Sequence, residues 1–178
     1  MYGDASRSRT SSCARSMRVV SPIVACFVLS LLFRRGRTSR ENGGVLSPQI
    51  PLSQSERCPC LSGQTYGECC GRFHAGDAFA PTAEQLMRSR YSAFSLGNTD
   101  YLLTTWHPST RPVSLELDGG QRWVRLDIVR TIKGGPLDVD GVVEFVAHYR
   151  QDRERHRQHE TSRFLRVDRR WLYLDSLE

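Results

Sequence analysis

Four of the six cysteines lie within thirteen positions and form the part of this sequence best suited to chemistry. They are Cys58, Cys60, Cys69 and Cys70. Four thiolates on one short turn suit a tetrahedral Zn²⁺ ion, with bonds to sulfur of about 2.3 Å. Pro59 favours the sharp turn that the Cys58–Cys60 spacing requires, because its ring holds φ at about −65°. A site closed by four cysteines leaves no position for a substrate, so the pattern predicts a structural zinc ion.

Two other arrangements of these residues stay open. His74 lies four residues after Cys70 and is an alternative fourth zinc ligand. Two disulfides are the other alternative. Because Cys69 and Cys70 are adjacent, both would have to pair back to Cys58 and Cys60, which is a strained arrangement.

His107 and Glu160 are candidate catalytic residues that would share one pocket. His107 follows Trp106 at the expected end of a helix, where an imidazole serves either as a general acid/base or as a helix cap. Glu160 is either its partner or the partner of a helix arginine, since an unpaired buried charge is costly. The sequence contains no Ser-His-Asp order, glycine-rich phosphate loop or HExxH string.

Aromatic and charged side chains after residue 76 are candidates for lining an internal ligand pocket. Arg88 and Arg90 lie about 200° apart around a helix, so at most one of them points inward. Glu160 and Arg163 have an odd spacing on a strand and face opposite sides. A packed core explains the aromatic residues equally well, because large aromatics mostly bury. The candidate set is Arg88, Arg90, Tyr91, Trp106, His107, Phe145, Glu160, Arg163 and Trp171.

Two helices and then a series of strands must position these residues. A capping box at Thr82 and Gln85 predicts a helix that ends at Gly97. Asn98 is suited to cap a second helix, which would extend through Trp106. The hydrophobic period then changes to two, with strands expected at 124–129, 143–149, 164–167 and 171–175, and with Val124 on the face of Leu126 and Ile128. Helices followed by antiparallel strands define an α+β fold.

The cysteine segment resembles a SEC-C motif, the zinc-binding element also found at the end of the SecA translocation ATPase. The pattern is Cys-x-Cys, eight residues, then Cys followed by Cys or His, and Ser62, Gly63 and Tyr66 match the intervening consensus. Leu61 replaces the usual glycine. Gln64 and Thr65 replace a common lysine pair, so the basic face of other SEC-C motifs is missing.

The stretch after the cysteines resembles the YchJ family of uncharacterised bacterial proteins, in unbroken order over about residues 57–178. The matching segments are 86–94, 100–108, 143–147, 160–164 and 171–175. The resemblance implies a SEC-C-type zinc knuckle followed by a nuclear transport factor 2-like (cystatin-like) domain, in which a cone of helices packs on a curved antiparallel sheet. It divides the chain into an extension at 1–55, a knuckle at 56–75 and the cone domain at 76–178.

The net charge of +6 comes entirely from the N-terminal segment. Residues 58–178 carry 16 basic and 16 acidic side chains, which gives zero. This balance, together with the missing lysine pair, argues against a nucleic-acid partner.

The arginine-rich extension contains a short apolar run at 19–33. A spanning helix needs about 20 apolar residues, so fifteen are too few for an ordinary crossing. The extension is interpreted as disordered or as a wrongly assigned start. The protein is then cytoplasmic, and the alternative is a membrane tether or a cleaved signal at 19–33.

These features predict a non-catalytic binding or adaptor module that contains structural Zn²⁺. The zinc knuckle would dock a protein partner, and the cone domain would bind a small ligand or a second copy across its open sheet face. The alternative is an enzyme with acid/base chemistry at His107 and Glu160.

Overall fold

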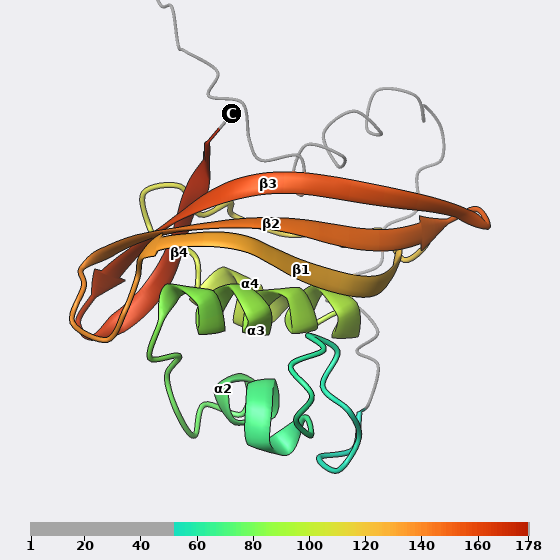
Figure 1. Ribbon diagram of the computed structural model, residues 1–178, viewed down its shortest axis with the longest axis horizontal. Coiled ribbons are helices and arrows are strands. Elements are labelled where there is room, and N and C mark those ends of the chain that lie inside the picture. Colours follow the sequence, from blue (N-terminus) through green and yellow to red (C-terminus); the bar gives the residue numbers. More distant parts are fainter. Residues whose placement is uncertain (1–51, 178) are drawn as a thin grey trace, which may run out of the picture.

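Short helices come first in this chain and a four-stranded antiparallel sheet follows (Figure 1). The structure is a computed structural model and describes residues 52–177. The expectations for the apolar run at 19–33, and for most of the extension at 1–55, lie outside the described residues. The elements, in order, are η2 (Gly67–Gly71), α2 (Arg72–His74), α3 (Ala83–Leu96), α4 (Thr99–Thr104), β1 (Arg122–Lys133), β2 (Asp140–Gln151), β3 (Glu154–Val167) and β4 (Arg170–Leu177). The α+β prediction is confirmed.

Local capping explains where α3 begins and ends. The Thr82 side chain accepts a hydrogen bond from the Gln85 backbone amide, and Gly97 ends the helix with φ of 73°. Both ends are those that the sequence predicts. Asn98 caps α4 by accepting from the Tyr101 amide, but α4 ends at Thr104, two residues earlier than expected.

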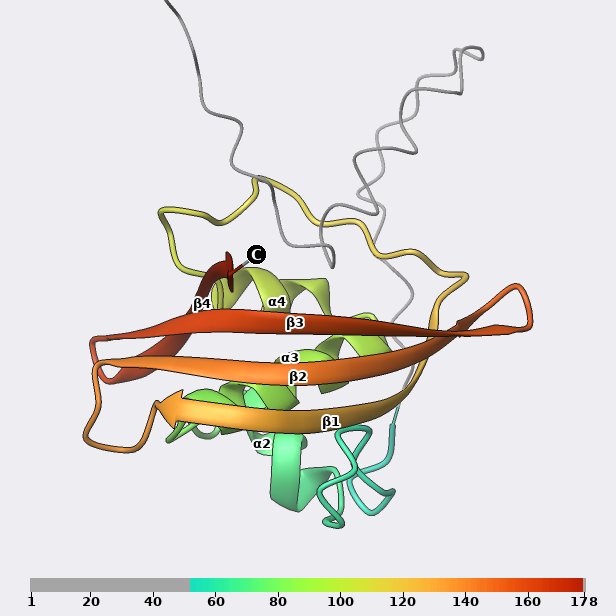
Figure 2. The ribbon, with the colours of Figure 1, turned by 45° about the horizontal axis from the view of Figure 1, so that its top comes forward.

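The four strands form one sheet in chain order, β1-β2-β3-β4, and each pairs antiparallel with the next. Two-residue turns, Asp152-Arg153 and Asp168-Arg169, join the last three strands, and all four turn residues have positive φ. Figure 2 shows β1, β2 and β3 lying side by side in front of the helices. The connections are therefore local, and each strand contacts mainly its neighbours in the chain.

Helix α3 lies across one face of the sheet, here called the inner face (Figure 1). Strand β2 alternates as expected, with Val143, Phe145 and Ala147 buried beneath the helices. The residues between them, such as Glu144, lie on the opposite, outer face. The core sits between α3 and the inner face, because burial there removes apolar side chains from water.

A bulge near the start of β1 changes which residues face the core. Trp123 pairs with Tyr149 and Arg125 pairs with His148, so Val124 is an extra residue between two pairs. Val124 is 40% exposed, and the expectation that it shares the face of Leu126 is wrong. Trp123 packs inward in its place, with its ring 5.3 Å from that of Tyr149.

Among the helices of residues 52–177, none is long and apolar enough to cross a membrane.

Candidate metal centre

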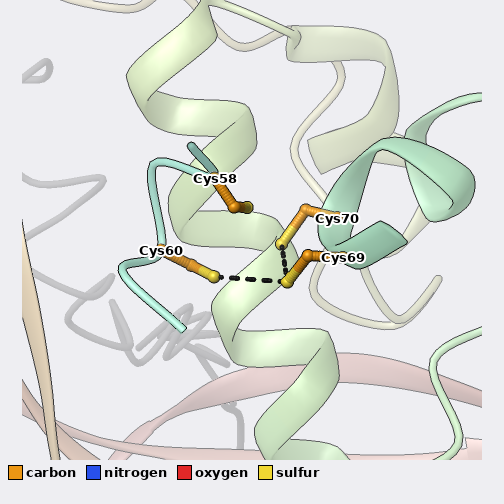
Figure 3. A group of neighbouring side chains, drawn as sticks. All are labelled: Cys58, Cys60, Cys69 and Cys70. Carbon is orange, nitrogen blue, oxygen red and sulfur yellow. Dashed lines mark hydrogen bonds between the residues drawn. The ribbon is translucent and has the colours of Figure 1, made fainter. Parts of the chain in front are cut away.

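The four cysteine sulfurs gather at one point beside α3 (Figure 3). All four Sγ atoms lie within 4.8 Å of one another, and all four residues are buried. The Cys60 and Cys69 sulfurs are 3.5 Å apart, and those of Cys69 and Cys70 are 3.7 Å apart. Sulfurs at the corners of a tetrahedral zinc site are separated by about 3.8 Å, given zinc–sulfur bonds of about 2.3 Å. The donor set therefore fits a four-coordinate Zn²⁺ ion.

Two short backbone segments bring the sulfurs together. In the first, the Cys58 amide donates to the Gln64 carbonyl at 3.0 Å and the Leu61 amide donates to the Cys58 carbonyl at 3.0 Å. Leu61 has φ of 57° at this turn, in the left-handed region that favours glycine. This backbone conformation explains why the usual residue at this position of a SEC-C motif is glycine.

The second segment is the π-helical turn η2, which holds Cys69 and Cys70. Two adjacent residues on an ordinary helix point about 100° apart, and a local π-turn is a recurrent way to change that geometry at a functional site. Gly71 is required at the end of η2, because a Cβ atom there would lie 2.7 Å from the Tyr66 carbonyl oxygen.

The thiols are too close to ionise independently. The pKa of Cys60 is held far below its ordinary value because Cys58 and Cys70 hydrogen-bond to its sulfur. Hydrogen bonds with Cys58 and Cys60, together with burial, raise the pKa of Cys70. Burial raises the pKa of Cys69 to about 11. Four thiolates in this space require a cation among them.

The cysteine cluster packs directly against α3 and shares its buried core. The Cys58 sulfur lies 3.6 Å from the Ser92 hydroxyl of α3. Arg88 of the same helix donates to the Cys60 carbonyl at 3.4 Å. The cysteines belong to the same buried cluster as the α3 side chains Leu86 and Tyr91.

His74, the alternative fourth ligand, is occupied elsewhere. Its Nδ1 lies 2.8 Å from the Tyr66 hydroxyl, and its Nε2 lies 2.9 Å from the Ser89 carbonyl. Burial lowers its pKa. Both ring nitrogens therefore have protein partners, and the compact donor set is the four cysteines. None of these four forms a disulfide in the described structure.

Part of the predicted pocket set meets on the inner face of the sheet. Arg90, Trp106, Phe145 and Glu160 line a cavity of only about 10 Å³. The Arg90 guanidinium donates to the Leu102 carbonyl at 2.7 Å and lies 5.1 Å from the centre of the Trp106 ring. This volume is about that of one water molecule, so the side chains fill the interior themselves.

Burial lowers the pKa of Arg90 to about 10, opposed in part by the charge of nearby Glu160. Glu160 accepts hydrogen bonds from Ser162 at 2.7 Å and from Gln158 at 3.2 Å. His107 lies outside the lining of this cavity, and its Nδ1 lies 2.7 Å from the Ser109 hydroxyl. The two candidate acid/base groups are therefore in different surroundings.

The rest of the set is dispersed. Arg88 pairs with Glu84 at 2.8 Å, while Arg163 forms an ion pair with Asp175 on the outer face. Tyr91 and Trp171 are buried in the core. As the helical angle predicts, Arg90 points inward, with 3% exposure, and Arg88 does not.

A larger cleft, which the sequence does not predict, lies between the knuckle and the sheet domain. Its volume is about 480 Å³. The apolar part includes Phe73, Phe79 and Trp171, and the polar part includes Asp100 and Arg170. The Arg170 guanidinium lies 4.1 Å from the centre of the Phe79 ring. These residues come from α2, the following loop, α4 and β4, so no local sequence signal joins them.

A four-cysteine knuckle packed on a domain of helices and an antiparallel sheet defines the class: SEC-C motif proteins with an NTF2-like domain. The SEC-C motif matches residues 55–72, and the model described as "YchJ, middle NTF2-like domain" matches residues 82–176. The chain belongs to the YchJ-like family, whose curated relatives carry the name UPF0225.

Curated UPF0225 proteins match about two thirds of this chain. A UPF0225 protein of Corynebacterium efficiens is 51% identical over 124 residues, covering 70% of this chain and 95% of that protein. One of Streptomyces coelicolor is 53% identical over 118 residues, covering 66% of this chain and 92% of that protein.

Two solved structures share the fold. A SEC-C motif protein of Rhodopseudomonas palustris is 31% identical with a TM-score of 0.61, covering 67% of this chain and 96% of that one. A SEC-C motif protein of Psychrobacter arcticus is 28% identical with a TM-score of 0.58, covering 68% and 82%.

Proposed function

We propose that this protein is a non-catalytic binding module stabilised by a structural Zn²⁺ ion. The observation that carries the proposal is the gathering of four buried cysteine sulfurs within 4.8 Å. Bound there, zinc would supply structural cross-linking, since four protein ligands complete its tetrahedron and exclude substrate. The packing of the knuckle on α3 would then fix the position of the residues that flank it.

The cleft between the knuckle and the sheet domain is the proposed binding site. Its volume of about 480 Å³ is in the range of small-molecule sites, and its lining combines aromatic walls with a few charged groups. Phe79 is 54% exposed at its rim, with Arg170 stacked on the ring. We expect an amphipathic small molecule whose apolar part lies against Phe73 and Trp171. A protein segment of the same chemistry is the alternative occupant.

We propose a cytoplasmic location, because a four-cysteine zinc site needs reduced thiols. Four unpaired thiols close together persist in a reducing compartment, whereas an oxidising one would convert them to disulfides.

The zinc part is tested by metal analysis of the full chain purified under reducing conditions. We expect one zinc ion per chain. Cys58→Ser should lose it, and Cys26→Ser, outside the four-cysteine segment, should keep it. Wild-type protein without metal would contradict the proposal.

The binding part is tested by thermal denaturation against a collection of metabolites. A ligand of the cleft should raise the unfolding midpoint of wild type and of Val139→Ala, an exposed control, but not of Phe79→Ala. A stabilising compound whose effect persists in Phe79→Ala would contradict the cleft. Conversion of a compound by wild type, lost in Glu160→Gln, would favour the enzyme alternative.

A further inference from the structure

The outer face of the sheet carries two rows of basic side chains near the β2–β3 turn. Arg122, Arg150 and Arg155 lie directly opposite one another on β1, β2 and β3. The next row of outward-facing residues along these strands contains Arg125, His148 and Arg157. All five arginines are exposed. The alternation of the strands sets this face, because the intervening residues point to α3.

The residues between the two arginine rows show which face of the sheet each row occupies. Trp123, Tyr149 and His156 form a row of rings between the two arginine rows, with centroid distances of 5.3 Å and 5.2 Å. Trp123 also meets Tyr91 of α3 at 5.8 Å. This row therefore faces inward, and the arginine rows face away from the helices.

Few carboxylates neutralise the rows. Among residues 52–177, no salt bridge involves Arg122, Arg150, Arg155 or Arg157. Asp127 is the acidic neighbour on this face, and it pairs with Arg125 at 2.6 Å and with His148 at 3.0 Å.

Like charges directly opposite each other on adjacent strands destabilise a sheet. The row Arg122–Arg150–Arg155 places three of them in line, on strands about 4.8 Å apart. The free protein bears this repulsion. A polyanion laid across the strands would convert it into attraction.

We propose that this outer-face patch binds the phosphate backbone of a nucleic acid. Arginine presents a planar fork that matches phosphate oxygens, and successive phosphates provide anions in a line. The two rows contain no Phe, Tyr or Trp on which bases would stack, so binding is independent of sequence.

Two other partners fit this face less well. A lipid surface is held by an inserted apolar face as well as by charge, whereas the apolar side chain exposed between the arginine rows is a single small one, Val124. A second copy packed here face to face would oppose arginine to arginine.

The balanced charge of residues 58–178, which argues against nucleic acid, is an average over the surface. The strand register separates the charges, since Glu154 lies on the other face, 3.9 Å from His156. Titration with an oligonucleotide decides between the two inferences.

The test is a titration of fluorescent oligouridine with the full chain over a series of salt concentrations. The double variant Arg150→Gln/Arg155→Gln removes two charges from the patch. Arg111→Gln/Arg169→Gln removes two exposed charges elsewhere and is the matched control. Arginines of the N-terminal segment are common to all variants and cancel in the comparison.

We expect the patch variant to bind about tenfold more weakly than the control, with a salt slope shallower by about 1.4, since each lost phosphate contact on a single strand removes about 0.7. Equal affinity and slope for the two variants would overturn the proposal. So would binding to vesicles of anionic phosphatidylglycerol, through these arginines, without binding to the oligonucleotide.

Arg155→Glu separates binding from folding. It places an acid opposite Arg150, so it should weaken oligouridine binding while raising the unfolding midpoint by about 2–4 °C. Loss of binding together with a lower midpoint would attribute the loss to misfolding, and retained binding would exclude the patch.

Discussion

The Cys58 sulfur lies 3.6 Å from the Ser92 hydroxyl, in the buried contact between the knuckle and α3. Ser92 has no exposed surface, so water does not compete with the sulfur for its hydroxyl. A hydroxyl that donates to a ligand sulfur stabilises the thiolate and fixes its direction. The cysteine cluster and the domain core therefore form one structural unit.

Ser92→Ala should weaken both metal binding and folding. Loss of the hydrogen bond to Cys58 should lower zinc affinity about 10- to 100-fold and the free energy of unfolding by about 1–2 kcal/mol. Competition with a chromophoric chelator and urea denaturation measure the two effects. Ser95→Ala is the control on the same helix, because no hydrogen bond in the described structure joins Ser95 to a cysteine. Wild-type affinity in Ser92→Ala would show that the contact has no effect on the metal.

Leu61→Gly should make the metal-loaded protein more stable. Leu61 is 55% exposed and has φ of 57°, so glycine would relieve the backbone with little loss of burial. The expected gain is about 0.5–1 kcal/mol, after the larger entropy of glycine in the unfolded chain is subtracted. Leu61→Ala keeps the strain and should not gain, and a destabilised Leu61→Gly would disprove the strain argument.

Local signals predict much of this fold. Thr82, Gln85 and Gly97 act within one helical turn, so the ends of α3 follow from the sequence. The four clustered cysteines are equally local, because two short segments contain them all. Glu160 and Arg163 face opposite sides of the sheet as their odd spacing predicts.

Features that depend on distant partners were not predictable in this way. The Arg122–Arg150–Arg155 row arises from the register of three strands, which the bulge at Val124 helps to set. The cleft combines residues from both ends of the domain, such as Phe79 and Arg170. The small size of the inner cavity depends on side-chain packing, which periodicity does not describe.

Arg90→Met should destabilise the protein strongly, because it removes a buried charge whose neighbours remain. Arg90 is 3% exposed and binds the Leu102 carbonyl and the Thr105 hydroxyl. Breaking such a buried network costs about 3–5 kcal/mol. Chemical denaturation of Arg90→Met, Glu160→Gln and the double variant measures their coupling. The double variant should be more stable than the sum of the single effects by about 1 kcal/mol or more. Strict additivity would show that Arg90 and Glu160 do not interact.

Tyr101 should make the protein sensitive to alkali. Burial raises its pKa from the ordinary 10 to about 12. Between these values the unfolded chain has lost the phenolic proton and the folded chain keeps it. Stability is therefore full below pH 10 and falls by about 2–3 kcal/mol as the pH rises to 12.

Denaturation at a series of pH values checks this fall. Tyr101→Phe should make the fall between pH 10 and 12 shallower without abolishing it, because burial also raises the pKa of Tyr66 and of Tyr91, which both remain in the variant. An unchanged curve in Tyr101→Phe would assign the alkaline sensitivity to another group.

The chain order of the strands also bears on how the protein is made. The contact between Cys58 and Ser92 closes a segment of 34 residues, all of which precede β1. Synthesis proceeds from the N-terminus, so the cysteines and α3 leave the ribosome before any strand of the sheet. The sheet then grows by neighbouring hairpins, which have low loop-closure entropy. A metal ion captured by the nascent cysteines would give the emerging strands an ordered helix on which to assemble.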